Sequence, residues 1–213
     1  MIRYILFDKD SAKTKVWQKR LGERHPIQVT TASVDNIPAD IYISPANGHG
    51  QLDGGIDKVY RTMFPGLQTI VNEILKEYKD RKPPVGVGSG ILIDIPNRKT
   101  KLLLAPTMDL PTKLKTPWNS FWSALMIFYL TRDMMNVMPL TIAIPGLGTG
   151  TGHLEADEMI DMVKLAWTIS QTHPLEEVYR DFRYEYVPGV KLVLSESLHE
   201  RPISQRLRQM VQN

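Results

Sequence analysis

Short apolar runs and amphipathic segments alternate along most of the chain. Continuous or alternating apolar residues predict strands, whereas apolar residues that recur every three or four positions predict helices. The predicted strands span residues 2–7, 27–32, 40–44, 90–95, 101–106, 138–144 and 191–195. The predicted helices span 13–21, 56–79 with a break at Pro65-Gly66, 116–134 and 155–170, and a short helix and a terminal basic helix are expected after Pro174.

This alternation of strands and helices is typical of an α/β fold. Strands that pass into helices through short loops predict a three-layer α/β/α sandwich. The turn at 96–98 predicts a hairpin, so we expect a mixed sheet. No linker is long enough to divide the chain, which predicts one domain over residues 1–213. Its core would span about 27–170, with the N-terminal strand and helix and the C-terminal basic tail as additions.

The composition is that of a globular protein without cysteine. Hydrophobic residues make up 42% and charged residues 23% of the 213 positions, and the cysteine count is 0. This composition excludes disulfides, a thiol nucleophile and a thiolate metal site. No apolar run approaches the roughly 18 residues of a membrane helix, and the N-terminus lacks the pattern of a signal peptide. We therefore expect a cytoplasmic protein with no membrane partner.

The small positive net charge, +3 with neutral histidines, is spread along the chain. Denser basic patches occur at 13–24 and 201–208. Such patches are more often solvated helix faces than nucleic-acid surfaces, so we expect no nucleic-acid partner.

Two glycine-rich loops depart from this ordinary pattern. The first, S-P-A-N-G-H-G-Q-L-D-G-G-I-D at 44–57, joins a predicted strand to a predicted helix. The second, P-G-L-G-T-G-T-G at 145–152, also lies between a strand and a helix. A glycine-rich turn before a helix directs unpaired N–H groups at one point, where an anion is favoured. Two such loops, both beyond the carboxyl ends of strands, predict a ligand with two phosphates, or with a phosphate and a sugar.

Several familiar sites are excluded by residue type and spacing. Neither loop carries the lysine of a Walker motif, and the second lacks the spacing of a dinucleotide fingerprint. Gly88-Ser89-Gly90 is not a nucleophile elbow, because Val87 occupies the first position of that motif. The 5 histidines lie too far apart for a local metal motif, so we expect no metal and no other cofactor. His49 and His153 stand in the two loops, where they would either line a pocket or face solvent.

The two loops resemble the motifs of macro domains. The matching segments are S-P-A-N at 44–47, D-G-G-I-D at 53–57 and P-G-L-G-T-G at 145–150. They are most similar to a bacterial and phage branch that also carries A-P-T-M, here at 105–108. The resemblance covers roughly residues 27–170 and implies a fold that binds ADP-ribose in a cleft above a mixed sheet. By this analogy the first loop holds the distal ribose and the second wraps the diphosphate.

The resemblance also implies two candidate catalytic residues. In hydrolytic macro domains an asparagine matching Asn47 holds the distal ribose, and an aspartate matching Asp57 orients or activates water. An amide binds sugar hydroxyls as donor and acceptor, while a carboxylate positions water or accepts a proton. Two structural interpretations stay open beside these roles: Asn47 would stabilise the turn, and Asp57 would cap the following helix.

Other candidate contacts with the ligand lie in the two loops and after the strand at 27–32. The glycines are expected there because a Cβ would block close approach of a ligand to the backbone. The candidate ligand-binding residues are Ser33, Asp35, Ala46, Gly54, Gly55, Ile56, Gly146, Leu147, Gly148, Thr149, Gly150, Thr151 and Gly152.

The sequence departs from the family pattern at three places. Ser33 stands where many members carry the aspartate that accepts a hydrogen bond from the adenine amino group, and Asp35 follows it. Asp53 replaces a glycine, and we expect it to point away from the diphosphate or to contact sugar hydroxyls. Thr151 and Gly152 stand where an aromatic residue often covers the distal ribose.

The leading hypothesis is that the chain binds ADP-ribose or an ADP-ribosylated substrate. Binding would occur with or without hydrolysis of an ADP-ribosyl ester or an ADP-ribose phosphate. The alternative is a non-catalytic module for contact with protein or nucleic acid, suggested by the altered adenine site and the basic tail at 201–208. A third hypothesis is a phosphatase or transferase that acts on another sugar nucleotide.

Overall fold

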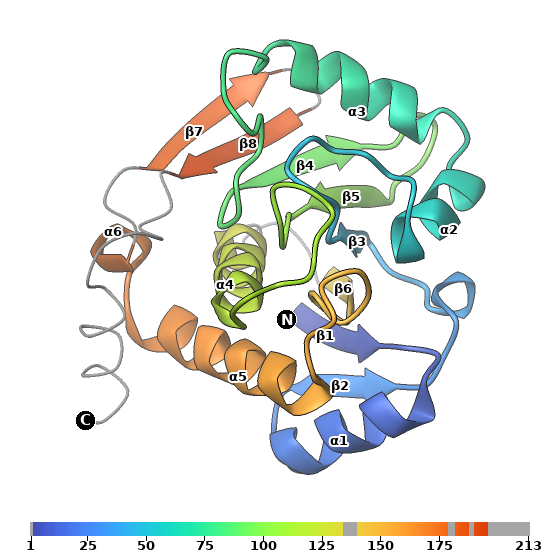
Figure 1. The fold of residues 1–213 in the computed structure, drawn as a ribbon, viewed down its shortest axis with the longest axis vertical. Coiled ribbons are helices and arrows are strands. Elements are labelled where there is room, and N and C mark those ends of the chain that lie inside the picture. The colour runs from blue at the N-terminus through green and yellow to red at the C-terminus, as the bar shows by residue number, and fades with distance from the viewer. Residues whose placement is uncertain (1, 134–139, 179–181, 188–189, 196–213) are drawn as a thin grey trace.

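The computed structural model describes residues 2–133, 140–178, 182–187 and 190–195. Its strands form an eight-stranded sheet in the order β2-β1-β6-β3-β5-β4-β8-β7 (Figure 1). The strands are β1 (Ile2–Phe7), β2 (Ile27–Thr30), β3 (Ile41–Ser44), β4 (Gly90–Asp94), β5 (Lys101–Leu104), β6 (Leu140–Pro145), β7 (Phe182–Val187) and β8 (Val190–Ser195). The helices are α1 (Ser11–Leu21), the 3₁₀ turn η1 (Val34–Asn36), α2 (Gly55–Met63), α3 (Leu67–Lys76), α4 (Trp118–Asp133), α5 (Ala156–Thr172) and α6 (Leu175–Val178).

The sheet combines a parallel part with an antiparallel part, as predicted. β1 pairs in parallel with β2 and β6, and β3 pairs in parallel with β5 and β6. β4 runs antiparallel to β5 across the predicted turn, where Asn97 adopts a φ of 60°. The carboxyl ends of the parallel strands therefore meet along one edge of the sheet.

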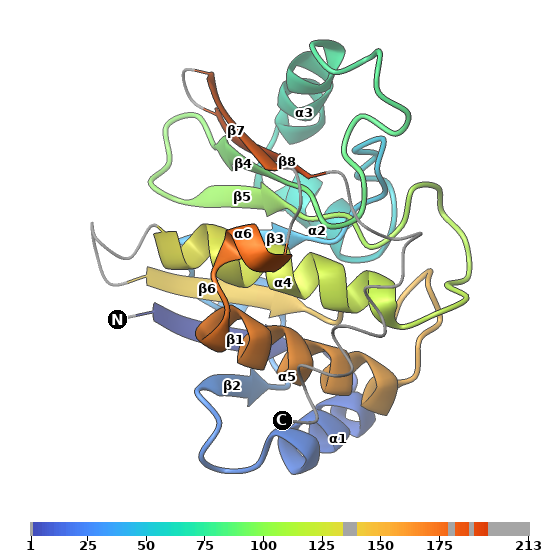
Figure 2. The same ribbon diagram turned by 90° about the vertical axis from the view of Figure 1, so that its left-hand side faces the viewer.

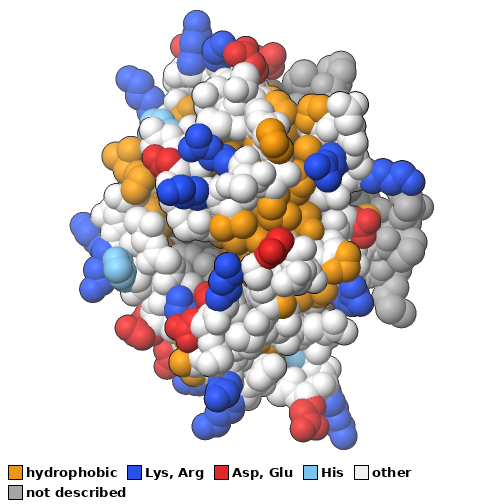
Figure 3. Space-filling view, turned by 90° about the vertical axis from the view of Figure 1, so that its right-hand side faces the viewer, with side chains coloured by type: hydrophobic (Ala, Val, Ile, Leu, Met, Phe, Trp, Pro, Cys, Tyr) orange, Lys and Arg blue, Asp and Glu red, His pale blue; other side chains and the backbone are white. Residues whose placement is uncertain are grey.

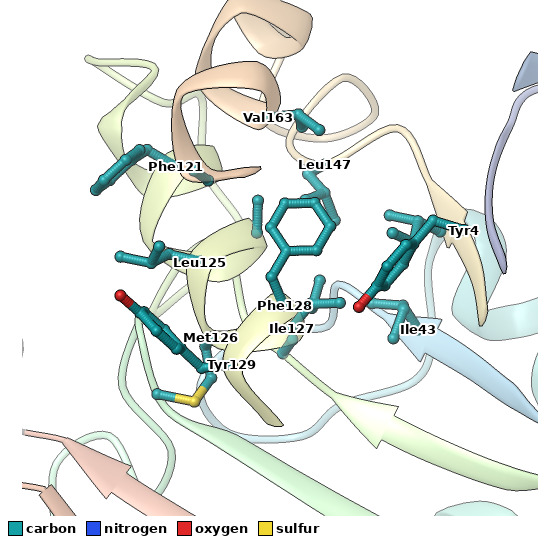
Figure 4. Packing of buried hydrophobic residues seen from close by; sticks show 14 of the residues in the cluster. Tyr4, Ile43, Phe121, Leu125, Met126, Ile127, Phe128, Tyr129, Leu147 and Val163 are labelled. Carbon is teal, nitrogen blue, oxygen red and sulfur yellow. The ribbon is translucent and has the colours of Figure 1, made fainter. Parts of the chain in front are cut away.

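Helices cover both faces of the sheet, which confirms the predicted three-layer sandwich (Figures 1 and 2). α1, α4 and α5 pack with one face in a first buried cluster, and α2 and α3 pack with the other face in a second. α4 is buried from Ser120 to Thr131 because it lies between the sheet and α5. Figure 4 shows Phe128 of α4 on the side of Tyr4 of β1, and the centroids of the two rings lie 5.2 Å apart. A helix that is apolar on every side is stable only when it is enclosed in this way.

The N-terminal strand lies inside the sheet instead of extending it. Tyr4 of β1 pairs with Ile27 of β2 on one side and with Ile142 of β6 on the other. The predicted core that begins near residue 27 therefore leaves out the strand that lies between the edge strand β2 and β6. The helix after β1 begins where the Asp10 side chain accepts a hydrogen bond from the N–H group of Ala12 at 2.8 Å.

The C-terminal part of the chain agrees with the predictions only in part. The predicted strand at 191–195 is present as β8, and its hairpin partner β7 was not predicted. The basic tail at 201–208 and its helix lie outside the described residues. Among the helices that are described, none combines the length and apolar character required to cross a bilayer.

Candidate functional site

A cleft of about 370 Å³ lies at the carboxyl edge of the parallel strands. Segments that follow β1, β3, β5 and β6 line it, so both glycine-rich loops border the same hollow, as their positions in the sequence predicted. A volume of this size is within the usual range for a small-molecule site, roughly 300–1,000 Å³. The predicted residues that line it are Ala46, Asn47, Gly54, Gly55, Ile56, Asp57, Gly146, Gly148, Thr149, Gly150, Thr151 and Gly152.

Three of the predicted ligand contacts lie elsewhere. Ser33 donates a hydrogen bond to the carboxylate of Asp35 at the surface, and neither side chain is part of the cleft lining. Leu147 is fully buried in the core cluster beneath the second loop, because its apolar side chain packs with α4 and α5. His49 and His153 are exposed and do not border the cleft either.

Asn47 organises the first loop while it lines the cleft. Its Oδ1 atom accepts hydrogen bonds from the N–H groups of His49 at 3.0 Å and Gln51 at 3.5 Å. Its Nδ2 atom lies 3.4 Å from Oε1 of Gln51, which also borders the cleft. These bonds agree with the turn-stabilising interpretation of Asn47, and its amide nitrogen also faces the side chain of Gln51 in the lining.

Asp57 is a buried carboxylic acid in the wall of the cleft. Ser44, at the end of β3, donates a hydrogen bond of 2.6 Å to Oδ1 of Asp57. Burial raises the pKa of Asp57 from 3.8 to about 7, the Ser44 hydrogen bond lowers it, and the nearby charge of Asp53 raises it. Near neutral pH this carboxyl group therefore interconverts between its protonated and charged forms, as a general acid or base must.

The helices that follow the two loops have N-termini of different kinds. α2 begins after Gly54, where no side chain caps the helix, and its first residues Gly55 and Ile56 border the cleft. α5 begins with a capping box in which Glu155 and Glu158 satisfy each other's backbone N–H groups. Unpaired N–H groups at a helix N-terminus attract anions, whereas a carboxylate cap occupies that position. Of these two helix ends, that of α2 therefore has the geometry that favours an anion.

Carbonyl groups of the second loop accept hydrogen bonds from other parts of the protein. The carbonyl of Leu147 accepts a hydrogen bond from Ser120, and that of Gly152 accepts one from the N–H group of Leu114. No bond within the described residues engages the N–H groups of Thr149, Gly150 or Thr151. The residues that carry these amides border the cleft, so this loop can offer donors to a ligand without a helix terminus.

Glycine stands at these positions of the two loops for different physical reasons. At Gly54 and Gly150, which both border the cleft, a Cβ would meet no atom within 4 Å. A Cβ at Gly148 would lie 2.8 Å from Leu114, and a Cβ at Gly152 would lie 2.4 Å from the carbonyl oxygen of Gly148. Gly148 and Gly152 are therefore required by packing of the loop itself, and not only by close approach of a ligand.

Sequence reasoning missed the part of the lining that follows β1. Asp8 and Lys9 border the cleft from the β1–α1 connection and Lys13 borders it from α1, and Val34 and Val59 are also part of the lining. Asp8 directly follows a predicted strand, so the rule that placed both loops at the carboxyl edge also applies to it. Elsewhere along the described ranges, no group of three or more His, Asp or Glu side chains is arranged to hold a metal ion.

Two solved structures share this architecture. The macrodomain of Mycobacterium tuberculosis DarG superposes with a TM-score of 0.55 and 15% identity, over 65% of this chain and 88% of that one. The macrodomain of Thermus aquaticus DarG gives a TM-score of 0.52 and 15% identity, over 63% and 85% of the two chains. The chain has a macrodomain fold. The resemblance stated from the loop motifs is thus confirmed at the level of the fold.

A comparison by sequence finds a relative of this chain. An uncharacterized protein of Aquifex aeolicus (strain VF5) is 29% identical over 130 residues, which are 59% of this chain and 71% of that protein. No protein-family model matches the sequence. The fold and the cleft are therefore the basis for inferring a function.

Proposed function

We propose that this chain binds ADP-ribose, or an ADP-ribosyl group on a larger substrate, in the cleft at the carboxyl edge of the sheet. One observation carries the proposal: two separate loops with available N–H groups face the same hollow, together with Asn47 and Asp57. A pyrophosphate needs donors on two sides, and its sugars need amide and carboxyl partners. The macrodomain fold, which the motif resemblance associates with ADP-ribose, supports the same ligand.

The N-terminus of α2 and the second loop would hold the diphosphate from opposite sides. Gly55 and Ile56 would donate from the helix end, and Thr149 and Gly150 would donate from the loop. The distal ribose would lie beside the amides of Asn47 and Gln51, close to the Asp57 carboxyl group. Asp53 borders the same end of α2, and a sugar hydroxyl is a better partner for its charge than a phosphate.

Calorimetric titration with ADP-ribose tests binding, with Gly54→Val as the probe of the cleft. Gly54 has an extended φ of −129° and open space at its Cβ, so valine leaves the fold intact and fills the helix end. We expect measurable binding by the wild type and at least a tenfold weaker affinity for Gly54→Val, since close backbone approach is lost. Gly86→Ala, which is equally open but outside the cleft lining, is the matched control.

Absence of heat from the wild-type protein at millimolar ADP-ribose would refute the proposal. Equal affinities of the wild type, Gly54→Val and Gly86→Ala would place the ligand outside this cleft. Thermal unfolding of all three proteins establishes that differences in affinity do not come from loss of the fold.

We further propose that Asp57 acts as the proton acceptor if the bound ADP-ribosyl group is hydrolysed. Its carboxylate would take a proton from water as the water oxygen bonds to the anomeric carbon. The bond from that carbon to the ester oxygen would break and release the carboxylate of the substrate, while Asn47 would hold the ribose. Release of ADP-ribose from an ADP-ribosyl ester should fall at least a hundredfold in Asp57→Asn. Binding by that variant should persist, because the amide keeps the volume and the acceptor for Ser44. Turnover by Asp57→Asn at the wild-type rate would remove Asp57 from the mechanism and leave a binding module.

A further inference from the structure

Among the described residues that line the cleft, Asn47 and Gln51 carry the amide side chains. Figure 3 shows the side of the molecule toward which β1 and β2 point in Figure 1, and hydrophobic side chains gather across its middle. Apolar walls enclose a ligand, whereas a few precisely placed polar groups fix its orientation and provide specificity. The contacts that hold these two amides in place therefore affect what the cleft binds.

The first loop, which carries both amides, packs against α3. The backbone at Gly50 approaches this helix so closely that a Cβ there would lie 2.4 Å from the side chain of Leu75 and 2.8 Å from that of Val71. Gly50 also has a φ of 68°, which residues other than glycine rarely adopt. α3 therefore directly supports the first loop.

Gln68 of α3 bonds to the loop on both sides of Gln51. Its Oε1 atom accepts a hydrogen bond from the N–H group of Leu52 at 2.8 Å, and its Nε2 atom donates one to the carbonyl oxygen of Gly50 at 3.0 Å. The same Nε2 atom donates to Oδ1 of Asn72, one turn along the helix, at 2.9 Å. A primary amide has two donor hydrogens, so both hydrogens of Gln68 are used and the orientation of its amide is fixed.

Gln51, between the two bonded residues, stands beside Asn47 in the cleft. Leu52 is fully buried, whereas Gln51 is exposed and lines the cleft. The N–H group of Gln51 donates to Oδ1 of Asn47, and its Oε1 atom lies 3.4 Å from Nδ2 of Asn47. Gln68 itself does not border the cleft, so its effect on a ligand must pass through the loop that carries these two amides.

We propose that Gln68 is a positioning residue, which holds the amides of Gln51 and Asn47 where they favour a nucleotide that carries a terminal sugar. This role rests on the proposed function, because it requires the distal ribose of ADP-ribose to lie beside these amides. An amide pairs with sugar hydroxyls as donor and as acceptor. An amide that is already held in place loses little conformational entropy when the sugar binds, so the bonds from Gln68 increase the affinity for that sugar.

The groups that would hold the diphosphate are anchored separately from Gln68. The carbonyl of Leu52 accepts a hydrogen bond of 3.5 Å from Nη1 of Arg61 on α2, which connects the end of the loop to that helix. In the part of the chain that the structure describes, neither the first turn of α2 nor the second loop makes a hydrogen bond to Gln68. Loss of the Gln68 bonds should therefore weaken contacts with the sugar and spare those with the diphosphate.

Calorimetric titrations with ADP-ribose and with ADP, which lacks the distal ribose, test this role. The wild type should bind ADP-ribose about tenfold more tightly than ADP, because one or two hydrogen bonds to sugar hydroxyls contribute that much. Gln68→Met keeps the length of the side chain and removes the bonds to Gly50 and Leu52. Its preference for ADP-ribose should fall about fivefold, with the affinity for ADP unchanged.

Two comparison variants separate positioning from stability. Gln51→Ala should lower the same preference, and its combination with Gln68→Met should lower it by less than the product of the two factors, because both changes act on one amide. Thr69→Ala, at the exposed neighbouring position of α3, is the matched control and should keep both affinities. Both nucleotides are measured on the same folded protein, so a loss of stability alone does not change the ratio of their affinities.

The two nucleotides also distinguish failure of this role from failure of the proposed function. Absence of binding of either nucleotide by the wild type contradicts the proposed function itself. Equal affinities of the wild type for ADP-ribose and ADP, or an unchanged preference in Gln68→Met, overturn the role of Gln68 and leave nucleotide binding intact. An equal loss of affinity for both nucleotides in Gln68→Met also overturns it, because that result indicates disruption of the whole cleft.

A second substitution keeps the role testable if Gln68→Met does not fold. Gln68→Glu retains the acceptor for the N–H group of Leu52 and loses the donor to the carbonyl of Gly50. A reduced preference for ADP-ribose in this variant supports the positioning role, and a preference equal to that of the wild type overturns it.

Discussion

At the residue scale, the protonation of Asp57 affects both the free energy of unfolding and the proposed proton transfer. The carboxyl group is buried, and the hydrogen bond from Ser44 offsets only part of the cost of its charge. A group of this kind is retained in the protonated form up to neutral pH, where it can exchange a proton with a reacting molecule. The same property makes the free energy of unfolding depend on pH.

Asp57→Asn should remove a pH dependence of the free energy of unfolding. The folded protein raises the pKa of Asp57 to about 7, above its ordinary value of 3.8. The folded state therefore keeps a proton that the unfolded state releases between these values, and the free energy of unfolding falls as pH rises through this window. Each pKa unit corresponds to about 1.4 kcal/mol. Urea unfolding at pH 4 to 8 should show a shallower decline for Asp57→Asn; parallel curves for the two proteins would contradict the shifted pKa.

Ser44→Ala tests the origin of the same shift. Ser44 donates to the charged form of Asp57, so its loss should raise the pKa of Asp57 further. If the protein hydrolyses an ADP-ribosyl ester through Asp57, the rise of the rate with pH should move to higher pH in Ser44→Ala. An unmoved or lowered midpoint of the pH–rate profile would exclude this hydrogen bond as a cause.

Residue types and spacing allowed Asn47 and Asp57 to be predicted as cleft residues, but not their partners. Ser44 and Asp57 meet because β3 ends beside the first turn of α2. Asp8 was missed because no motif surrounds it; its place depends on which strands are neighbours in the sheet. Such neighbours are set by long-range pairing, which residue patterns alone do not define.

At the level of elements, the two loops are built differently although their sequences look alike. The first leads into an uncapped helix, whereas the second turns its carbonyls into contacts with Ser120 and Leu114 and ends before a capped helix. The sequence predicted that both loops bind an anion. It did not reveal that, of the two helices that follow these loops, α2 lacks a side-chain cap and α5 has one, because capping depends on side-chain geometry.

Alanine substitutions in the second loop should separate its structural and ligand-facing positions. Gly148 has a φ of 78°, and its Cβ would lie 2.8 Å from Leu114 and 2.9 Å from Leu154. Gly148→Ala should lower the free energy of unfolding by about 1–3 kcal/mol, since it combines strain with overpacking. Gly150→Ala should leave that free energy nearly unchanged and weaken ADP-ribose binding. Chemical denaturation and calorimetry distinguish the two; equal destabilisation would contradict the assignment.

Most strands and helices followed from periodicity, because long apolar repeats strongly favour one element type. The three-layer arrangement followed from their alternation. The place of β1 between β2 and β6 did not, because the residue pattern of Ile2–Phe7 does not define which strands are its neighbours. β7 was also missed, although Phe182–Val187 alternates apolar and charged residues.

At the scale of the whole molecule, the cleft depends on the order of the strands. β1, β6, β3 and β5 are neighbours in the sheet, so segments that are distant in sequence end at one edge. The cleft thereby combines an acidic and basic end after β1, two loops rich in N–H groups, and a buried acid on α2. This combination is the physical basis for proposing an ADP-ribosyl ligand.

The crystal structure of the complex with ADP-ribose tests the central claim most directly. If ADP-ribose binds in this cleft, electron density for the diphosphate should lie between the N–H groups of Gly55 and Ile56 and those of Thr149 and Gly150. The distal ribose should lie beside Asn47. Density for the diphosphate at any other place on the protein, with this cleft free of ligand, would contradict the proposed binding site.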